Sequence, residues 1–354
     1  MMLRYLVPAC IALAAAALFF AGRTTGATAA RPCALDMPLR PADCARLVDA
    51  RGRDTETSAR PATGSAILLY AAEPFQSQVA EFAIGPKGLS PAGAIPLGTG
   101  AAPTALAVDR AQHLYVAVSS FSATGPQEVR VFARGASHPA RTYRAGLTGP
   151  VGVALSPGNT LYVANLATPG APQCTASQGN GNVVEYAAGS LKPTAVVTGI
   201  PGCPRGVALD ANSNLYVSYS LLLPGSEDSD VLEYSPGSTT GTPLHLHVPS
   251  GANLYSLAFD ARGNLVVANS TEDDSLNQIL IYPPGSRTPS RTIQYGGYWG
   301  PEWFALWNDR IFAPAYIAEP LSMAAGEFAY PSGRQLAAQN PPGLYYYGFA
   351  VGSP

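Results

Sequence analysis

The segment PRGVALDANSNLYVSYS, residues 204–220, contains two short apolar runs separated by a polar turn. Both runs are rich in β-branched and aromatic residues, which is typical of a β-hairpin. An aromatic residue followed three positions later by glycine comes next, and this element occurs six times at steps of 50, 54, 48, 48 and 48 residues. A β-rich repeat of this period predicts a radial or solenoidal array of small sheets. The six copies are Phe82-Ala-Ile-Gly85, Phe132-Ala-Arg-Gly135, Tyr186-Ala-Ala-Gly189, Tyr234-Ser-Pro-Gly237, Tyr282-Pro-Pro-Gly285 and Tyr330-Pro-Ser-Gly333.

Two further motifs precede most of these copies and predict four strands in each repeat. The first motif is similar to GVALD, and the second, after a short turn, is similar to LYVAN. The third strand ends in the aromatic residue, and a weaker run such as 194–198 or 291–295 forms the fourth. Four antiparallel strands per repeat predict the blade of a β-propeller. The first motif occurs as PTALAVD (103–109), PVGVALS (150–156), PRGVALD (204–210), LYSLAFD (254–260) and PEWFALW (301–307).

The first of the six units, 66–97, has no GVALD-like strand, although its other three strands are present. A matching strand occurs at the other end of the chain, at Tyr347-Gly-Phe-Ala-Val351. We therefore predict an all-β fold, a six-bladed β-propeller of four-stranded antiparallel blades in which the C-terminal strand joins the N-terminal blade. Such closure removes the open sheet edge that a linear array would leave.

The N-terminus has the features of a secretory signal. Arg4 precedes an apolar run at 5–21, and Ala27-Thr28-Ala29 is a candidate cleavage site. A single membrane anchor is the alternative. We expect a secreted or periplasmic protein with no integral membrane segment after cleavage. The expected parts are a signal peptide at 1–30, a Cys-containing N-terminal extension at 31–62 and the six-bladed β-propeller at 63–354.

Composition limits the partners that this chain can have. The formal net charge is −2 and charged residues make up only 12% of the chain, so no basic field is available to bind nucleic acid. A hydrophobic content of 47% supplies enough apolar surface to exclude a disordered chain. We expect a monomer without a nucleic-acid partner.

Four cysteines remain once the signal is removed, and an even number in an exported chain predicts two disulfide bonds. Four cysteines allow three pairings. We favour Cys33–Cys44, which are eleven residues apart, together with Cys174–Cys203, which lie in loops on one face of the same predicted blade.

Residues 204–220 and the segment SLAFDARGNLVVANS (256–270) resemble NHL repeats. They also resemble the six-bladed propellers of the gluconolactonase/regucalcin group and of the streptogramin lyases. The resemblance covers 65–354 and implies the propeller fold, but the family includes lactonases, lyases and protein- or RNA-binding modules. Gluconolactonase-like enzymes hold their metal ion partly with an asparagine, but this chain has no clear Pro-Asn-Gly element to supply it. Streptogramin lyases use a catalytic histidine near the axis, but no histidine of this chain lies at the start of a predicted axial strand. No catalytic set of the family is therefore carried over.

Residues just before the predicted first strands should surround the mouth of the central channel. A cation, a carboxylate and several aromatic rings there could bind a polar ligand with an apolar or aromatic face, such as a small molecule, a glycan or a protein. The alternative is that Arg205 and Glu302 form a pair that plugs the channel. Asn165 and Asn269 end second strands on the same face. The predicted ligand-binding residues are Arg205, Tyr255, Glu302, Trp303, Tyr347, Asn165 and Asn269, and Thr104 and Val151 occupy equivalent positions.

Two neighbouring acidic loops form a candidate site for calcium or another divalent cation, because calcium prefers six to eight oxygen ligands. The alternative is that both loops are simply solvated. Asp109, Asp210 and Asp260 follow first strands and are interpreted as caps of tight turns. His245 and His247 are expected on one side of an outer strand, where two imidazoles do not make a zinc site. The candidate metal ligands are Asp228, Asp230, Glu272, Asp273 and Asp274.

Three functions remain compatible with the sequence. The favoured hypothesis is an exported binding module that uses the channel-mouth face. The alternative is a metal-dependent, lactonase-like hydrolase or lyase at the same face, with Glu302 and the acidic loops as metal ligands. The third is a purely structural envelope protein.

Overall fold

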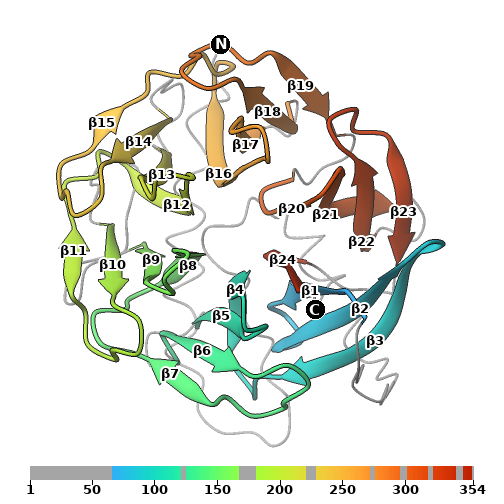
Figure 1. The fold of residues 1–354 in the computed structure, drawn as a ribbon. Helices are drawn as coiled ribbons and strands as arrows, with labels where there is room; N and C mark the ends of the chain where they lie inside the picture. Colours follow the sequence, from blue (N-terminus) through green and yellow to red (C-terminus); the bar gives the residue numbers. More distant parts are fainter. Residues whose placement is uncertain are drawn as a thin grey trace, which may run out of the picture. The chain divides into compact units, whose positions relative to one another are not determined.

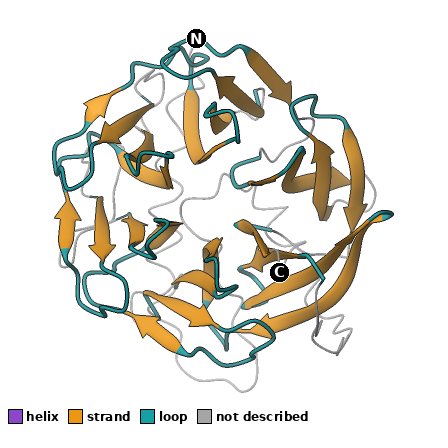
Figure 2. Ribbon diagram, viewed as in Figure 1, coloured by secondary structure: helices purple, strands orange, loops and turns teal. Residues whose placement is uncertain are grey.

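The structure is a computed structural model, and it describes residues 66–120, 125–166, 181–220, 229–271, 276–295, 301–317, 322–339 and 346–352. These residues form β-strands and turns, and none of them forms a helix that could cross a membrane (Figure 2). The predicted signal peptide and N-terminal extension lie outside the described residues.

The strands form six sheets of four antiparallel strands around a central axis, which confirms the predicted six-bladed propeller (Figure 1). Blade 1 contains β1 (Leu68–Glu73), β2 (Gln78–Gly85), β3 (Gly88–Pro96) and β24 (Phe349–Gly352). Blade 2 contains β4 (Ala102–Val108), β5 (Leu114–Ser119), β6 (Glu128–Phe132) and β7 (Arg141–Tyr143), and blade 3 contains β8 (Pro150–Leu155), β9 (Leu161–Asn165), β10 (Asn182–Tyr186) and β11 (Ala195–Val197).

The remaining three blades have the same strand order from the axis outward. Blade 4 contains β12 (Cys203–Leu209), β13 (Leu215–Ser220), β14 (Asp230–Tyr234) and β15 (Thr242–Pro243). Blade 5 contains β16 (Ala252–Phe259), β17 (Leu265–Thr271), β18 (Gln278–Tyr282) and β19 (Arg291–Gln294). Blade 6 contains β20 (Ala305–Trp307), β21 (Arg310–Ile317), β22 (Ser322–Ala329) and β23 (Gln335–Gln339).

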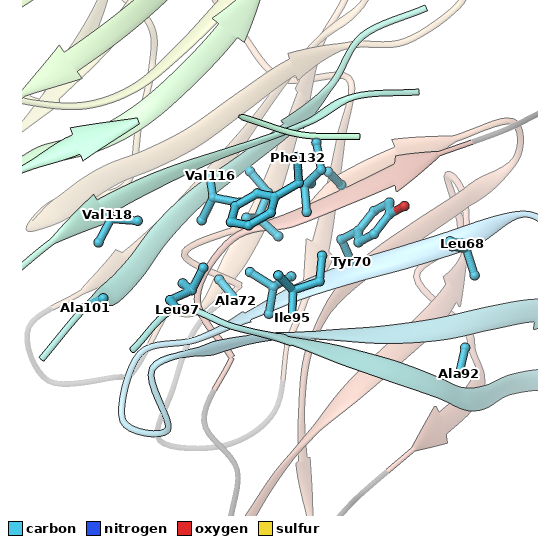
Figure 3. Close-up of a cluster of buried hydrophobic side chains, with 14 residues drawn as sticks. Leu68, Tyr70, Ala72, Ala92, Ile95, Leu97, Ala101, Val116, Val118 and Phe132 are labelled. Atoms are coloured by element: carbon cyan, nitrogen blue, oxygen red, sulfur yellow. The ribbon is translucent and has the colours of Figure 1, made fainter. Parts of the chain in front are cut away.

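The repeated aromatic residue and its glycine have separate structural roles. In blades 2 to 5 the aromatic side chain ends the third strand and is buried, as shown by Phe132 in the apolar cluster between blades 1 and 2 (Figure 3). Phe82 lies inside β2, and Tyr330 follows β22 and is half-buried.

In five of the six copies the glycine has a positive φ, for example 73° at Gly135 and 77° at Gly237, a conformation that residues with a Cβ adopt only at a cost. Gly85 of blade 1 is the exception and is the last residue of the extended strand β2. Packing and turn geometry together explain this element of the repeat.

The aspartates after the first strands cap the following turns, as predicted. Asp210 Oδ1 accepts hydrogen bonds from the backbone N–H groups of Asn212 and Asn214, each at 2.8 Å. Asp260 makes the equivalent bonds, and Asp109 Oδ1 accepts one from the His113 N–H at 2.8 Å. These carboxylates are therefore part of the scaffold.

The C-terminal strand closes the ring, as the sequence predicted. β24 pairs with β1 in antiparallel register, from Leu68 opposite Gly352 to Ala71 opposite Phe349. The pairing continues beyond the strand, because the Tyr347 N–H donates to Ala72 O at 2.8 Å. One blade is thus built from residues at both ends of the described chain.

The first strands differ from the prediction in where they begin. Thr104, Val151, Arg205 and Tyr255 were expected just before the strands, but they lie inside them, where the register with the second strand shifts. Such a β-bulge inserts a residue that has no partner opposite and changes the direction of its side chain. The sequence pattern does not show these bulges, because a bulge is defined by the register between the first and second strands of a blade.

Neighbouring first strands approach closely around the axis, and Gly206 is one position that allows this. A Cβ at Gly206 would lie 2.7 Å from Tyr255 O and 2.9 Å from Ser256 Cα of the next blade, both of which are backbone atoms. We expect Gly206→Ala to lower the free energy of unfolding by about 1–3 kcal/mol, because neither strand can move without disturbing its own pairing. Chemical denaturation measures the change.

The control for this substitution is Gly158→Ala, where the nearest atom to an added Cβ is the Ser156 hydroxyl oxygen at 3.8 Å. Its stability should stay within about 0.5 kcal/mol of the parent. Equal stability of the two variants would contradict close packing at the axis.

The outer strand of blade 4 also differs from the prediction. β15 contains only Thr242 and Pro243, so His245 and His247 lie beyond it rather than on one side of an outer strand. Proline cannot donate a hydrogen bond to a sheet, which is consistent with the early end of the strand. His245 has a φ of 53°, so the backbone leaves the extended conformation there.

Candidate functional site

Four of the predicted ligand-binding residues come together at one end of the channel. The Arg205 guanidinium lies over the Tyr255 ring, 5.7 Å from its centroid. The Trp303 ring contacts the Tyr255 ring edge-on at a centroid distance of 5.7 Å and the Tyr347 ring at 4.3 Å. We call Arg205, Tyr255, Trp303 and Tyr347 the mouth cluster.

Four different blades supply the members of the mouth cluster. Arg205 and Tyr255 occupy the bulges of β12 and β16, while Trp303 precedes β20 and Tyr347 precedes β24. Each side chain is half-buried. A single blade therefore cannot form this site, and the closed ring is needed to assemble it.

An axial cavity of about 90 Å³ lies next to the mouth cluster and is lined by residues from all six blades, including Arg205 and Trp303. A water molecule occupies roughly 30 Å³ in the liquid, so this cavity holds only a few waters. A ligand larger than that would contact the mouth cluster from outside the channel.

Arg205 has unused hydrogen-bonding capacity. Its Nε atom is buried and has no hydrogen-bond partner among the residues that the structure describes. The ion pairs among the described residues do not include one between Arg205 and Glu302, the pair that the alternative interpretation placed in the channel. A buried donor without a partner costs roughly 1–3 kcal/mol, which a ligand acceptor would recover.

Glu302 and the two predicted asparagines are placed differently. The Glu302 backbone O accepts a hydrogen bond from the Ser256 N–H at 3.0 Å, which links blades 6 and 5. Asn165 is fully buried, and its Nδ2 donates to Gly146 O at 2.9 Å and to Asn182 Oδ1 at 3.0 Å.

Asn269 is fully buried as well, and its Nδ2 donates to Leu276 O at 3.2 Å. Neither asparagine lines the axial cavity. Both hold connecting segments within the protein.

The candidate metal site is described only at Asp230. Its Oδ2 accepts the His245 N–H at 2.8 Å and its Oδ1 accepts the Leu246 N–H at 3.0 Å, so the carboxylate fixes the chain after β15. Among the described residues, no group of three His, Cys, Asp or Glu side chains could hold a metal ion. The calcium site stays a prediction, because Asp228, Glu272, Asp273 and Asp274 lie outside the described residues.

The disulfide pairs also stay predictions. Cys203 is buried at the start of β12, whereas Cys33, Cys44 and Cys174 lie outside the described residues. Cys203 lies two residues before Arg205, which occupies the bulge of β12. A disulfide bond at Cys203 would therefore lie close to Arg205.

Sequence reasoning missed a second concave region. A groove of about 840 Å³ lies between the chain that leaves blade 3 and the outer part of blade 4. It is lined by Tyr219, Tyr234, Asp230 and His245, among others. The signal in the sequence was Gly241, four residues after Gly237, where three other repeats have Pro139, Pro193 and Pro289 four residues after the corresponding glycine.

No protein-family model matches the chain, and no curated protein matches it. The resemblance to NHL repeats is therefore not confirmed beyond the propeller fold. Among solved structures, a chain of the nidogen/laminin complex is 16% identical with a TM-score of 0.60, and the match covers 80% of this chain and 98% of that one.

A Bacteroides caccae protein of unknown function is 14% identical with a TM-score of 0.56, over 81% of this chain and 99% of that one. Hydrazine synthase from Kuenenia stuttgartiensis is 16% identical with a TM-score of 0.51, over 73% of this chain and 80% of that one. Identities this low show a shared fold and not a shared function.

Proposed function

We propose that this protein is an exported binding module whose mouth cluster binds an anionic ligand with a flat apolar or aromatic face. The observation that carries the proposal is the Arg205 guanidinium, which lies against Tyr255 beside the axial cavity and leaves its buried Nε without a partner. A carboxylate is the acceptor that an arginine fork pairs with best.

The aromatic rings determine which carboxylates would fit. Trp303 lies between Tyr255 and Tyr347, so a flat ligand would meet three aromatic side chains next to one cation. Aromatic contacts contribute roughly 0.5–1.5 kcal/mol each beyond the area they bury. A small aromatic acid satisfies both parts of the site, and an acidic aromatic group on a glycan or protein would present the same chemistry.

Export is part of this proposal and rests on the N-terminal sequence. The nidogen/laminin structure contains a related propeller in a protein complex, which supports a propeller as a binding scaffold in general. The metal-dependent hydrolase stays a prediction, since the acidic loops on which it depends lie outside the described residues.

The proposal is tested by titrating 4-hydroxybenzoate, with 4-hydroxybenzyl alcohol as the neutral analogue, and following tryptophan fluorescence and heat. We expect the acid to bind and the alcohol to bind at least about tenfold more weakly, because the charge-assisted hydrogen bond is lost. Arg205→Gln should reduce the affinity for the acid by about tenfold or more.

Arg262→Gln is the matched control, since it removes one positive charge from an exposed turn at the end of β16. Its affinity for 4-hydroxybenzoate should equal that of the parent. Binding that is unchanged in Arg205→Gln, or equal for the acid and the alcohol, would reject the proposed role of the mouth cluster.

A further inference from the structure

The groove between blades 3 and 4 is a second concave surface, separate from the mouth cluster. Its volume of about 840 Å³ lies within the range of small-molecule sites, roughly 300–1,000 Å³. The groove is lined by hydroxyl and aromatic side chains, one carboxylate and one imidazole. The residues that carry these groups are Thr198, Thr239, Thr240, Ser229, Tyr219, Tyr234, Asp230 and His245.

Tyr234 shows that the groove differs from the equivalent place in other blades. In blade 3, the Tyr186 hydroxyl donates to Ala145 O at 2.5 Å, and in blade 5 the Tyr282 hydroxyl donates to His247 O at 3.1 Å. The equivalent Tyr234 is only 2% exposed and lines the groove, yet its hydroxyl makes no hydrogen bond to any of the described residues.

Burial of the Tyr234 phenol raises its pKa to about 12, with no hydrogen bond contributing to the shift. The hydroxyl oxygen is not among the fully buried side-chain atoms that have no partner, so it is accessible at the surface of the groove. The phenol therefore offers a donor and an acceptor to a ligand in a cavity of ligand size.

Gly241 lines the groove and lies directly against the Tyr234 ring. A Cβ at Gly241 would lie 2.5 Å from Tyr234 Cζ, so the backbone can lie against the tyrosine ring only because this residue is glycine. β15 then ends after two residues, whereas β19 of blade 5 contains four. A Pro at position 241, as in three other repeats, would place a Cβ against the ring.

Charge decides which ligands suit the groove. No Lys or Arg side chain lines it, and its carboxylate belongs to Asp230, which is 7% exposed and already accepts two backbone N–H groups. An anionic ligand would meet this carboxylate without a counter-charge, which is unfavourable in a partly buried site. A neutral ligand rich in hydroxyl groups could instead donate to Asp230 and exchange hydrogen bonds with Tyr234 and the threonines.

We propose that the groove lined by Tyr234, Asp230 and the Thr239–Gly241 turn binds a neutral saccharide. The sugar hydroxyls pair with the phenol, the carboxylate and the threonine hydroxyls, while an apolar sugar face lies against the Tyr219 and Tyr234 side of the groove. This site is independent of the mouth cluster, since the two share no residue.

The test uses saturation-transfer NMR and calorimetry on the full chain with maltotriose, cellotriose and triacetylchitotriose as neutral probes. Trigalacturonate serves as the acidic probe. We expect at least one neutral trisaccharide to bind and trigalacturonate to bind at least about tenfold more weakly. Tyr234→Phe should weaken the neutral trisaccharide by about tenfold and leave the melting temperature unchanged, because the hydroxyl has no partner in the protein.

Tyr282→Phe is the matched control. It removes the same hydroxyl from an equivalent position where it donates to His247 O, so it should lower the melting temperature by about 2 °C and leave saccharide binding unchanged. Arg205→Gln should also leave saccharide binding unchanged. The proposal is overturned if none of the three neutral probes binds. It is also overturned if Tyr234→Phe binds the probe as tightly as the parent, or if Arg205→Gln abolishes binding.

Discussion

A chain that ends at Tyr346 should fail to form the cooperative fold of the parent. This truncation removes β24, whose four residue pairs with β1 close the ring, and it removes the Phe349 side chain, which is 4% exposed. Loss of one buried phenylalanine alone costs roughly 3–5 kcal/mol, which is a large part of the stability of a typical domain. It also leaves the backbone groups along one edge of β1 unpaired.

Thermal denaturation followed by circular dichroism, together with light scattering, measures the effect. We expect no cooperative transition and an increase in aggregation. A synthetic peptide of residues 347–354 added in trans should restore part of the transition, while a scrambled peptide of the same composition should not. A truncated chain that melts at the parent temperature would show that β24 does not hold the ring together.

Glu73 should make the propeller less stable as the pH rises from about 4.5 to 7. The carboxyl group is 1% exposed at the end of β1, and burial raises its pKa to about 7, although Gln78 Nε2 donates a hydrogen bond to Oε2 at 2.5 Å. The Tyr346 hydroxyl also acts on this carboxyl and lowers its pKa, but the effect of burial is larger. Because the folded chain binds the proton more tightly than the unfolded chain, stability is lost as the pH rises.

The expected loss from this group is about 3 kcal/mol, since one pKa unit corresponds to roughly 1.4 kcal/mol. Denaturant titrations of the parent and of Glu73→Gln at several pH values measure it. The difference in the free energy of unfolding between the two should be nearly constant below pH 4.5. It should then move in favour of Glu73→Gln up to about pH 7 and level off above it. A difference that does not change with pH would contradict the raised pKa.

Glu73 also shows a limit of sequence reasoning. Glu73 occupies the register position that Asn165 and Asn269 hold in their blades, opposite Gln78 as they lie opposite Asn182 and Gln278. Of these three residues, the sequence analysis considered Asn165 and Asn269 and predicted that they bind a ligand. All three side chains are buried and make contacts inside the protein.

The sequence by itself determined the architecture of this protein. The period of the aromatic-x-x-Gly element, the strand punctuation and the unmatched strand at Tyr347–Val351 predicted six blades and their closure. Two of these features are local, since glycines with positive φ and aspartate-capped turns act within one repeat, while the aromatic residues repeat the same packing between successive blades. A repeated local pattern therefore predicts a repeated local structure.

Only the tertiary structure decided which residues share a surface. The bulges in β12 and β16 direct Arg205 and Tyr255 to the axis, where blades 6 and 1 add Trp303 and Tyr347. Opening of the groove at Tyr234 depends on how blades 3 and 4 meet. Contacts between blades join residues that are tens to hundreds of positions apart, so a departure from the repeat such as Gly241 marks a different blade but does not show which residues it faces.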